Sequence, residues 1–225
     1  MGEPTLAEGA ALHHAHPMDP RRSFLDTTDA VAELVSRVPA DVLAGPGLGV
    51  WDMRGLIGHT SRAMSTVITY LKMPATSVTC PDARSYYVWV SDSPQQSEKI
   101  AARGVEAGAA LGDDIPAAFA GLARQVRGVL DHVPKGVDPV VSTLAGGMLL
   151  SQYLPTRTFE LIVHGYDIAR AANIEFAPHP EVVGETVALA ARIGVALGHG
   201  PDLVPVLTGR GSWTDTSVFT RPGQD

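Results

Sequence analysis

A helix predicted over about residues 151–172 constrains the fold more than any other feature of this sequence. Its apolar residues lie on almost every side, which is typical of a helix buried inside a protein. One stripe of the same helix is nevertheless polar, with steps of four, three, four and three residues: Tyr153, Arg157, Glu160, His164 and Asp167. A buried carboxylate or imidazole is costly unless it is paired, hydrogen-bonded or bound to a metal. We therefore expect a second element of the fold to meet this stripe.

Amphipathic helical spacing recurs along the rest of the chain and predicts an all-α fold. Asp52, and either Asp113 or Asp114, are placed to cap two of these helices. Four or five amphipathic helices without a convincing sheet predict an up-down bundle. The predicted helices cover about residues 20–38, from near Asp52 to before Pro74, 95–111, 113–133, 151–172 and 181–197.

Three segments carry no clear helical pattern. Residues 74–94 include the strand-like run YYVWV but no partner strand, and we interpret them as a partly ordered connection. Residues 137–147 are expected to form a loop, and the last 25 or so residues leave room for a short strand. Pro155 is expected in the first turn of the buried helix, where a missing N–H costs little.

Composition excludes several classes of protein. The formal net charge is −7, whereas a nucleic-acid binder needs a basic surface. No apolar run reaches the ~18 residues of a membrane span, so we expect no membrane partner. Cys80 is the only cysteine, which excludes an intramolecular disulfide framework and a cysteine-rich zinc module and suits a cytoplasmic location. Oligomeric state is left open by the sequence.

The first 19 residues are predicted to form a flexible tail. They lack the basic start and apolar core of a signal peptide. Three histidines cluster there, at positions 13, 14 and 16, and we expect no native metal site from so short a tract.

His59 is the best candidate to meet the polar stripe. It occupies an inward position between Leu56 and Ala63 on the second predicted helix, while Glu160 and His164 lie one turn apart on the buried helix. Two histidines and one carboxylate are the ligand set of catalytic zinc, which keeps a fourth position open for water or substrate. Nickel and cobalt accept the same donors. A di-iron site is excluded because it needs Glu-x-x-His on two helices.

A simpler interpretation of these residues needs no metal. Glu and His at i,i+4 are usually a solvated pair worth about 0.3 kcal/mol, and an inward histidine is usually a hydrogen-bonded core residue. The apolar surroundings of Glu160 and His164 argue against a solvated pair.

Two motifs carry a resemblance to a known family. The segments WDMRGLIGHTSRA (51–63) and YLPTRTFELIVHGYDIARA (153–171) resemble the motif helices of the mycothiol-dependent maleylpyruvate isomerase family, within the DinB-like metal-binding four-helix bundles. The resemblance covers about residues 20–175 and implies a bundle domain there, after the tail of residues 1–19. Residues 176–225 would form a short C-terminal extension, too small for the separate α/β domain of the full isomerase. By this match His59, Glu160 and His164 correspond to the family's metal ligands, usually occupied by zinc.

The resemblance implies a mechanism. Mycothiol is a low-molecular-weight thiol that the metal would hold as thiolate near neutral pH. The thiolate would attack an electrophilic, unsaturated small molecule. Departure of the thiol after bond rotation gives cis–trans isomerisation, and its retention on the product gives S-transfer. Cys80 is interpreted as a bystander, because the cofactor supplies the sulfur.

The other polar residues of the buried helix have candidate roles. Arg157 is a candidate to bind a substrate carboxylate or steady Glu160, although an ion pair with Asp167 or Glu160 would equally explain it. Asp167 is expected to orient a ligand histidine through its second ring nitrogen, or to cap a loop. Tyr153 is expected to hydrogen-bond a ligand or to pack.

Two further functions remain open from the sequence. One is a metal-dependent hydrolase in which bound water is the nucleophile. The other is a non-catalytic binding or regulatory module whose metal is structural or vestigial. Around this site, Trp51 is expected in the core at a helix entry, and Trp89, Tyr86 and Tyr87 are candidates for the mouth of a pocket.

Overall fold

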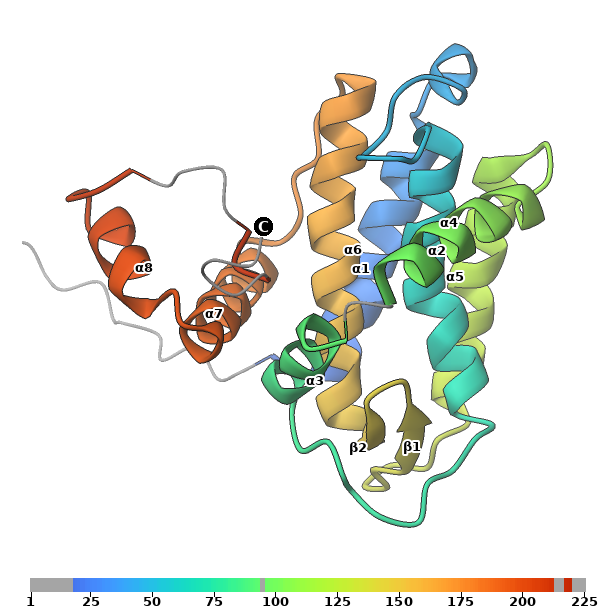
Figure 1. Cartoon of the computed structure of the whole chain (residues 1–225). Helices are drawn as coiled ribbons and strands as arrows, with labels where there is room; N and C mark the ends of the chain where they lie inside the picture. Colours follow the sequence, from blue (N-terminus) through green and yellow to red (C-terminus); the bar gives the residue numbers. More distant parts are fainter. Residues whose placement is uncertain (1–17, 94–95, 213–216, 220–225) are drawn as a thin grey trace, which may run out of the picture.

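The computed structural model describes residues 18–93, 96–212 and 217–219, and its centre is a four-helix bundle (Figure 1). The bundle helices are α1 (Pro20–Ser36), α2 (Met53–Tyr70), α5 (Ile115–Asp131) and α6 (Leu150–Ala172). Helices α1 and α6 run in one direction, and α2 and α5 run in the other (Figure 1). Helices α3 (Ala83–Ser91) and α4 (Gln96–Ala110) carry the chain back between α2 and α5. The predicted all-α, DinB-like bundle is confirmed.

Two predicted aspartate caps fix where bundle helices begin. The side chain of Asp52 accepts a hydrogen bond from the Gly55 N–H at 2.7 Å, at the start of α2. Asp114 accepts one from the Ala117 N–H at 3.0 Å, at the start of α5. Each bond satisfies a backbone donor that the first helical turn leaves free. The first cap matters for the site, because it sets the register of α2 and therefore the direction in which His59 points.

Helix α6 is buried along most of its length, as its composition predicted. It packs against α1, α2, α3 and α7 (Pro180–Leu197), so apolar side chains on nearly every side find a neighbour. The helix begins at Leu150, so Pro155 lies further inside it than expected. The left-handed residue Asn173, with φ of 53°, ends the helix.

The interpretation of residues 74–94 as a partly ordered connection is wrong for residues 83–91, which form α3. Asp82 caps this helix by accepting a hydrogen bond from the Ser85 N–H at 2.7 Å. Tyr86 and Tyr87 are buried on its inner side. The strand preference of aromatic residues is overridden here, because the bundle offers an apolar surface that a helix can cover.

The expected loop at 137–147 is instead mostly a β-hairpin. Strands β1 (Val140–Thr143) and β2 (Gly146–Leu149) pair antiparallel, with Val140 opposite Leu149. Gly146 has φ of 115°, a conformation that only glycine adopts readily. Four-residue strands are too short to show a clear alternation in the sequence. The hairpin closes the end of the bundle from which α6 starts (Figure 1).

The expected short strand near the C-terminus is a helix in the described residues. Gly198 ends α7 with φ of 106°, and α8 (Gly200–Leu207) follows with a proline in its first turn. Helix α7 lies beside α3 and α6, on the left of the bundle in Figure 1. Of the predicted tail of residues 1–19, residues 1–17, with the histidine cluster, fall outside the described residues. None of the described helices has the length and apolar character needed to cross a membrane.

Candidate metal centre

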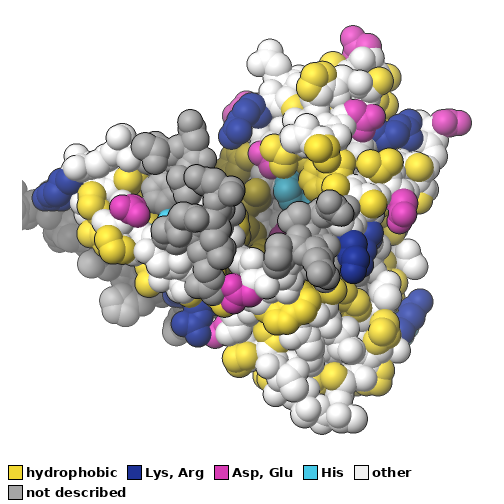
Figure 2. Space-filling view, viewed as in Figure 1, with side chains coloured by type: hydrophobic (Ala, Val, Ile, Leu, Met, Phe, Trp, Pro, Cys, Tyr) yellow, Lys and Arg dark blue, Asp and Glu magenta, His cyan; other side chains and the backbone are white. Residues whose placement is uncertain are grey.

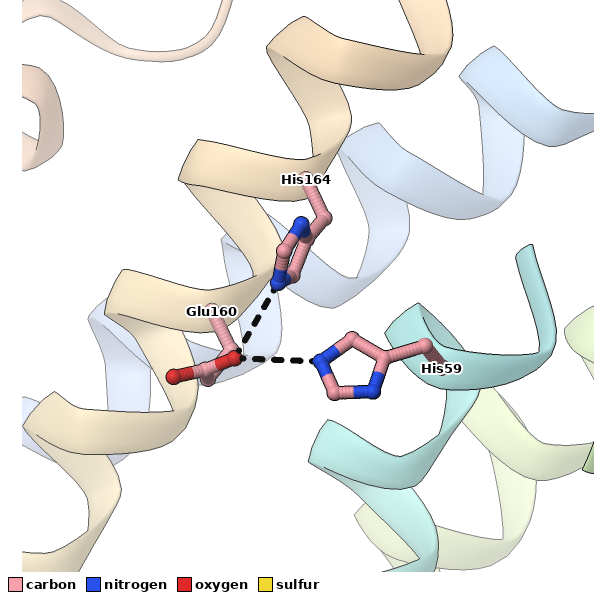
Figure 3. A group of neighbouring side chains, drawn as sticks. All are labelled: His59, Glu160 and His164. Atoms are coloured by element: carbon pink, nitrogen blue, oxygen red, sulfur yellow. Dashed lines mark ion pairs between the residues drawn. The ribbon is translucent and has the colours of Figure 1, made fainter. Parts of the chain in front are cut away.

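Three side chains from α2 and α6 converge inside the bundle (Figure 3). Glu160 Oε2 lies 3.6 Å from His59 Nε2 and 3.3 Å from His164 Nε2. One donor atom from each of these residues lies within 4.8 Å of the others. The side chains are only 13–21% exposed, so they are shielded from water but still reachable from one side. The sequence predicted this meeting from helical spacing alone.

The spacing of the donor atoms suits a small divalent ion. Zinc binds nitrogen and oxygen at roughly 2.0–2.2 Å in a tetrahedron, which sets donor atoms about 3.3–3.6 Å apart. The two separations from Glu160 Oε2 match that range. Three protein donors also leave a tetrahedral ion one open position. These residues could therefore hold a metal and leave it accessible to a further ligand.

Asp167 supports His164 from behind. Its Oδ2 lies 3.1 Å from His164 Nδ1, which leaves Nε2 facing Glu160. Burial lowers the pKa of His164, but the hydrogen bonds to Asp167 and Glu160 outweigh burial and raise it to about 9. A carboxylate on the outer nitrogen of a metal-binding histidine fixes the ring and its tautomer. The geometry matches the predicted role of Asp167 in orienting His164. Among the described residues, no contact shows Asp167 capping a loop.

Tyr87 supports Glu160 in the same way. Its hydroxyl lies 2.7 Å from Glu160 Oε1 and 3.0 Å from the carbonyl oxygen of Thr156. Burial raises the pKa of Glu160, but hydrogen bonds from His164 and His59 and the charge of Arg157 outweigh burial and hold it well below its usual range. Glu160 is therefore an anion at neutral pH, with Oε1 fixed by Tyr87 and Oε2 turned toward the two histidines.

His59 is held by an aromatic ring. The indole of Trp51 stacks on the imidazole with ring centres 4.4 Å apart, and Trp51 Nε1 donates to the carbonyl oxygen of Ala101 at 2.9 Å. Among the described residues, His59 Nδ1 is buried without a hydrogen-bond partner. Burial lowers the pKa of His59, so its imidazole is neutral and able to bind a metal. Trp51 lies at the start of α2, as expected, and it also holds this ring in place.

Arg157 and Tyr153 lie beside the three donors. The Arg157 guanidinium lies 5.2 Å from the centre of the Tyr86 ring and 5.0 Å from that of Tyr153, and its Nε donates to Thr156 Oγ1 at 2.9 Å. In the described part of the chain it forms no ion pair with Asp167 or Glu160, so the alternative of a structural ion pair is not found. Tyr153 is fully buried, and its hydroxyl donates to Thr66 Oγ1 at 2.9 Å.

The role of Tyr87 was not predicted, and Trp51 was expected only in the core at a helix entry. Tyr87 was expected at the mouth of a pocket. Its segment was not predicted to be a helix, so the direction of its hydroxyl could not be predicted. Trp51 precedes α2, which begins at Met53, so helical spacing does not predict its contact with His59. Of the other two expected pocket residues, Tyr86 lines the cavity beside the donors, whereas Trp89 is 37% exposed and does not line it. Cys80 is buried and free, away from that lining.

Metal binding is expected to release a proton and to strengthen with pH. His164, whose pKa is raised to about 9, is protonated at neutral pH in the metal-free protein and must lose that proton to bind a metal. Affinity should therefore rise about tenfold per pH unit from pH 7 to near 9 and then level off. The stability of the metal-free fold is expected to follow the opposite trend: the contribution of charged His164 should be complete below pH 6.5 and lost as pH rises through about 9.

Zinc titration against a competing chelator between pH 6.5 and 9.5 measures this dependence. Asp167→Asn serves as the comparison, because an amide removes the charge that raises the pKa of His164. Its affinity should level off at lower pH. An affinity independent of pH in the unmodified protein would contradict the assignment of His164.

Removing the Tyr87 hydroxyl is expected to weaken metal binding without removing the site. Tyr87→Phe leaves the ring in place but frees Glu160 Oε1 from its donor. Loss of such a supporting partner typically costs about 10–100-fold in metal affinity. Tyr166→Phe is the matched control, because Tyr166 lies on α6, the helix of Glu160, but is 38% exposed. Equal affinities in the two variants would show that the hydroxyl does not support Glu160.

The fold and the site define a four-helix bundle in which two histidines and a carboxylate could hold a metal ion. Comparison with family models narrows this class: residues 24–169 match the family described as the mycothiol maleylpyruvate isomerase N-terminal domain. The chain therefore belongs to this family, which confirms the resemblance identified from its motifs. No curated protein and no solved structure matches the chain.

Proposed function

We propose that this protein is a metal-dependent enzyme that uses mycothiol as cofactor or co-substrate. The thiolate of mycothiol adds to an electrophilic, unsaturated small molecule, and the reaction gives cis–trans isomerisation or S-transfer. The observation that carries the proposal is the convergence of His59, Glu160 and His164 beside a cavity that His59 and Glu160 line, in a chain of the mycothiol maleylpyruvate isomerase family. We also propose a cytoplasmic location, because a free thiol cofactor requires a reducing compartment.

The donor set supports a role in catalysis rather than in structure. Structural zinc is usually enclosed by four protein ligands, whereas three ligands leave a position for a reactant. A divalent metal held by His59, Glu160 and His164 would supply positive charge that stabilises a thiolate near neutral pH. One carboxylate among the ligands leaves a net positive site, which suits an anionic sulfur. Zinc is our first choice of metal, and nickel or cobalt fit the same donors.

The surrounding residues have separate tasks in this proposal. Asp167 keeps the ring of His164 oriented, and Tyr87 keeps Oε1 of Glu160 away from the two histidines. Trp51 covers one face of His59 and excludes water from it. Arg157, fixed between two tyrosine rings, supplies positive charge toward the same cavity. Tyr153 lines this cavity and holds Arg157, so its contribution to substrate binding is the position of that charge.

The isomerisation needs no reactant other than the thiol and the substrate. The thiolate forms a C–S bond at one carbon of a conjugated double bond, and the electron pair moves onto the adjoining carbonyl group. The former double bond is then single and can rotate. Return of the electron pair expels the thiolate and restores the double bond in the other geometry. In S-transfer the carbanion instead takes a proton, and the C–S bond remains.

Incubation of the zinc-loaded protein with mycothiol and a panel of α,β-unsaturated acids tests the proposal. Mass spectrometry and chromatography would report thiol adducts and isomerised products, and elemental analysis would report the metal. We expect turnover only when metal and mycothiol are both present. Addition of water to the substrate without mycothiol would instead indicate a metal-bound water as the nucleophile, as in the hydrolase alternative. Bound metal with no product under any condition would favour a non-catalytic module.

A further inference from the structure

A small cavity lies directly beside the candidate metal ligands. It has a volume of about 90 Å³, and His59 and Glu160 are part of its lining. Residues of α2, α3, α4 and α6 enclose it, together with Leu144 from the turn of the hairpin. Figure 2 shows histidine surface at the bottom of a hollow on this side of the bundle, bordered by hydrophobic side chains. A group bound in the cavity would therefore lie next to the metal site.

Three arginines from three different helices line this cavity. Arg62 comes from α2, Arg103 from α4 and Arg157 from α6. Over the described ranges, none of the three forms an ion pair within 4.0 Å of an acidic side chain. The one acidic residue in the described lining is Glu160, whose oxygens already face Tyr87 and the two histidines. Three cations without a matching anion are unexpected in a chain whose net charge is −7.

The arginines are close enough to repel one another. Burial lowers the pKa of Arg62, and the charges of Arg103 and Arg157 lower it further. Such clustering is unfavourable for the empty protein and becomes favourable when an anion binds among the guanidinium groups. Arg157 is also held rigidly, because its guanidinium lies over the rings of Tyr86 and Tyr153. A fixed guanidinium loses less side-chain entropy on binding than a free one.

The donor geometry of the arginines favours a carboxylate. The forked donors of each guanidinium match a planar carboxylate with two parallel hydrogen bonds. His59 and Glu160 belong to the same lining, so a molecule held there by its carboxylate would lie beside the candidate metal ligands.

We propose that Arg62 and Arg103, with Arg157, form a binding site for a carboxylate of the substrate. This inference rests on the proposed function, and it restricts the electrophile to small organic acids. The carboxylate fixes the molecule at one end and directs the adjoining carbons toward the metal ligands. Arg62 lies three residues after His59 on α2, so both side chains share one helical face.

Binding of propionate and propionamide to the zinc-loaded protein tests the site without mycothiol or turnover. The two probes have the same size and shape and differ in charge. NMR titration should show that the unmodified protein prefers propionate at least about 10-fold. Arg62→Gln and Arg103→Gln should each lower propionate affinity about 10–100-fold and leave propionamide unchanged. Arg124→Gln, an exposed arginine on α5, is the matched control and should retain the preference.

Several results would overturn the inference. Equal binding of both probes, or a preference that survives both substitutions, would exclude an arginine carboxylate site. A preference that disappears on zinc removal alone would place the carboxylate on the metal, and tighter binding of inorganic phosphate would exclude carboxylate as the specific anion. If a glutamine variant fails to fold, Arg62→Lys and Arg103→Lys keep the charge but lose the fork, and propionate binding should fall by a smaller factor.

This test separates the inference from the function on which it rests. Selective propionate binding without mycothiol-dependent product would support the arginine site and contradict the proposed enzyme. Mycothiol-dependent turnover of uncharged electrophiles at the same rate as acids would support the enzyme and contradict the arginine site.

Discussion

Glu160→Gln is expected to abolish stoichiometric metal binding while the bundle stays folded. Glutamine keeps the size of the side chain but removes the negative charge that faces His59 and His164. Loss of a supporting residue costs about 10–100-fold in metal affinity, so loss of a direct ligand should exceed ~100-fold. The charge of the site also changes, because a divalent ion would then have no anionic protein ligand. Any mycothiol-dependent activity should disappear together with the metal.

Elemental analysis after dialysis, paired with circular dichroism, measures this result. Glu33→Gln is the matched control, because Glu33 is an exposed carboxylate on α1. This control variant should bind about one zinc ion per chain. His59→Ala and His164→Ala should behave as Glu160→Gln does, and the exposed His132→Ala should behave as the control. Full metal content in any of the three site variants would contradict the three-ligand centre.

The main features of the site were predictable because helical periodicity is a local property. The steps from Tyr153 to Asp167 predict a shared face whatever the rest of the chain does, and the inward position of His59 follows from its own helix. The same reasoning predicted the bundle and two of its caps. These features depend on neighbours within about one or two turns, which a sequence shows directly.

What the sequence could not supply depends on packing between distant segments. The segment containing Tyr87 is helical because its aromatic residues meet the bundle, and this contact outweighs their preference for strands. The β-hairpin was missed because its strands are too short for a periodic pattern. Arg103 gave no signal in the sequence, since only the crossing of α4 over α2 brings it to the cavity. The proposed carboxylate site therefore depends on the packing of three helices, which the sequence does not show.

Gly58 lies where α4 crosses α2, and its substitution is expected to have the second large effect. Helices α2 and α4 approach so closely that a Cβ built on Gly58 would overlap the backbone of Gly108 and lie 2.6 Å from the carbonyl oxygen of Gly104. Backbone atoms of a helix cannot move aside as a flexible side chain can. The glycines at 104 and 108 are one turn apart, so they form a flat surface against Gly58. A methyl group here must push the two helices apart.

We expect Gly58→Ala to destabilise the protein by about 3 kcal/mol, at the upper end of the usual cost of overpacking. For a chain of this length that corresponds to a fall of about 6–12 °C in melting temperature. Separation of α4 from α2 would also disturb Trp51, whose indole packs at Gly104 and stacks on His59, so zinc affinity should fall too. Gly128→Ala is the control: its site on α5 has no atom within 4 Å, so alanine should stabilise the helix by about 0.5–1 kcal/mol. Thermal unfolding of both variants with and without zinc measures the difference, and equal melting temperatures would contradict the close crossing that positions His59.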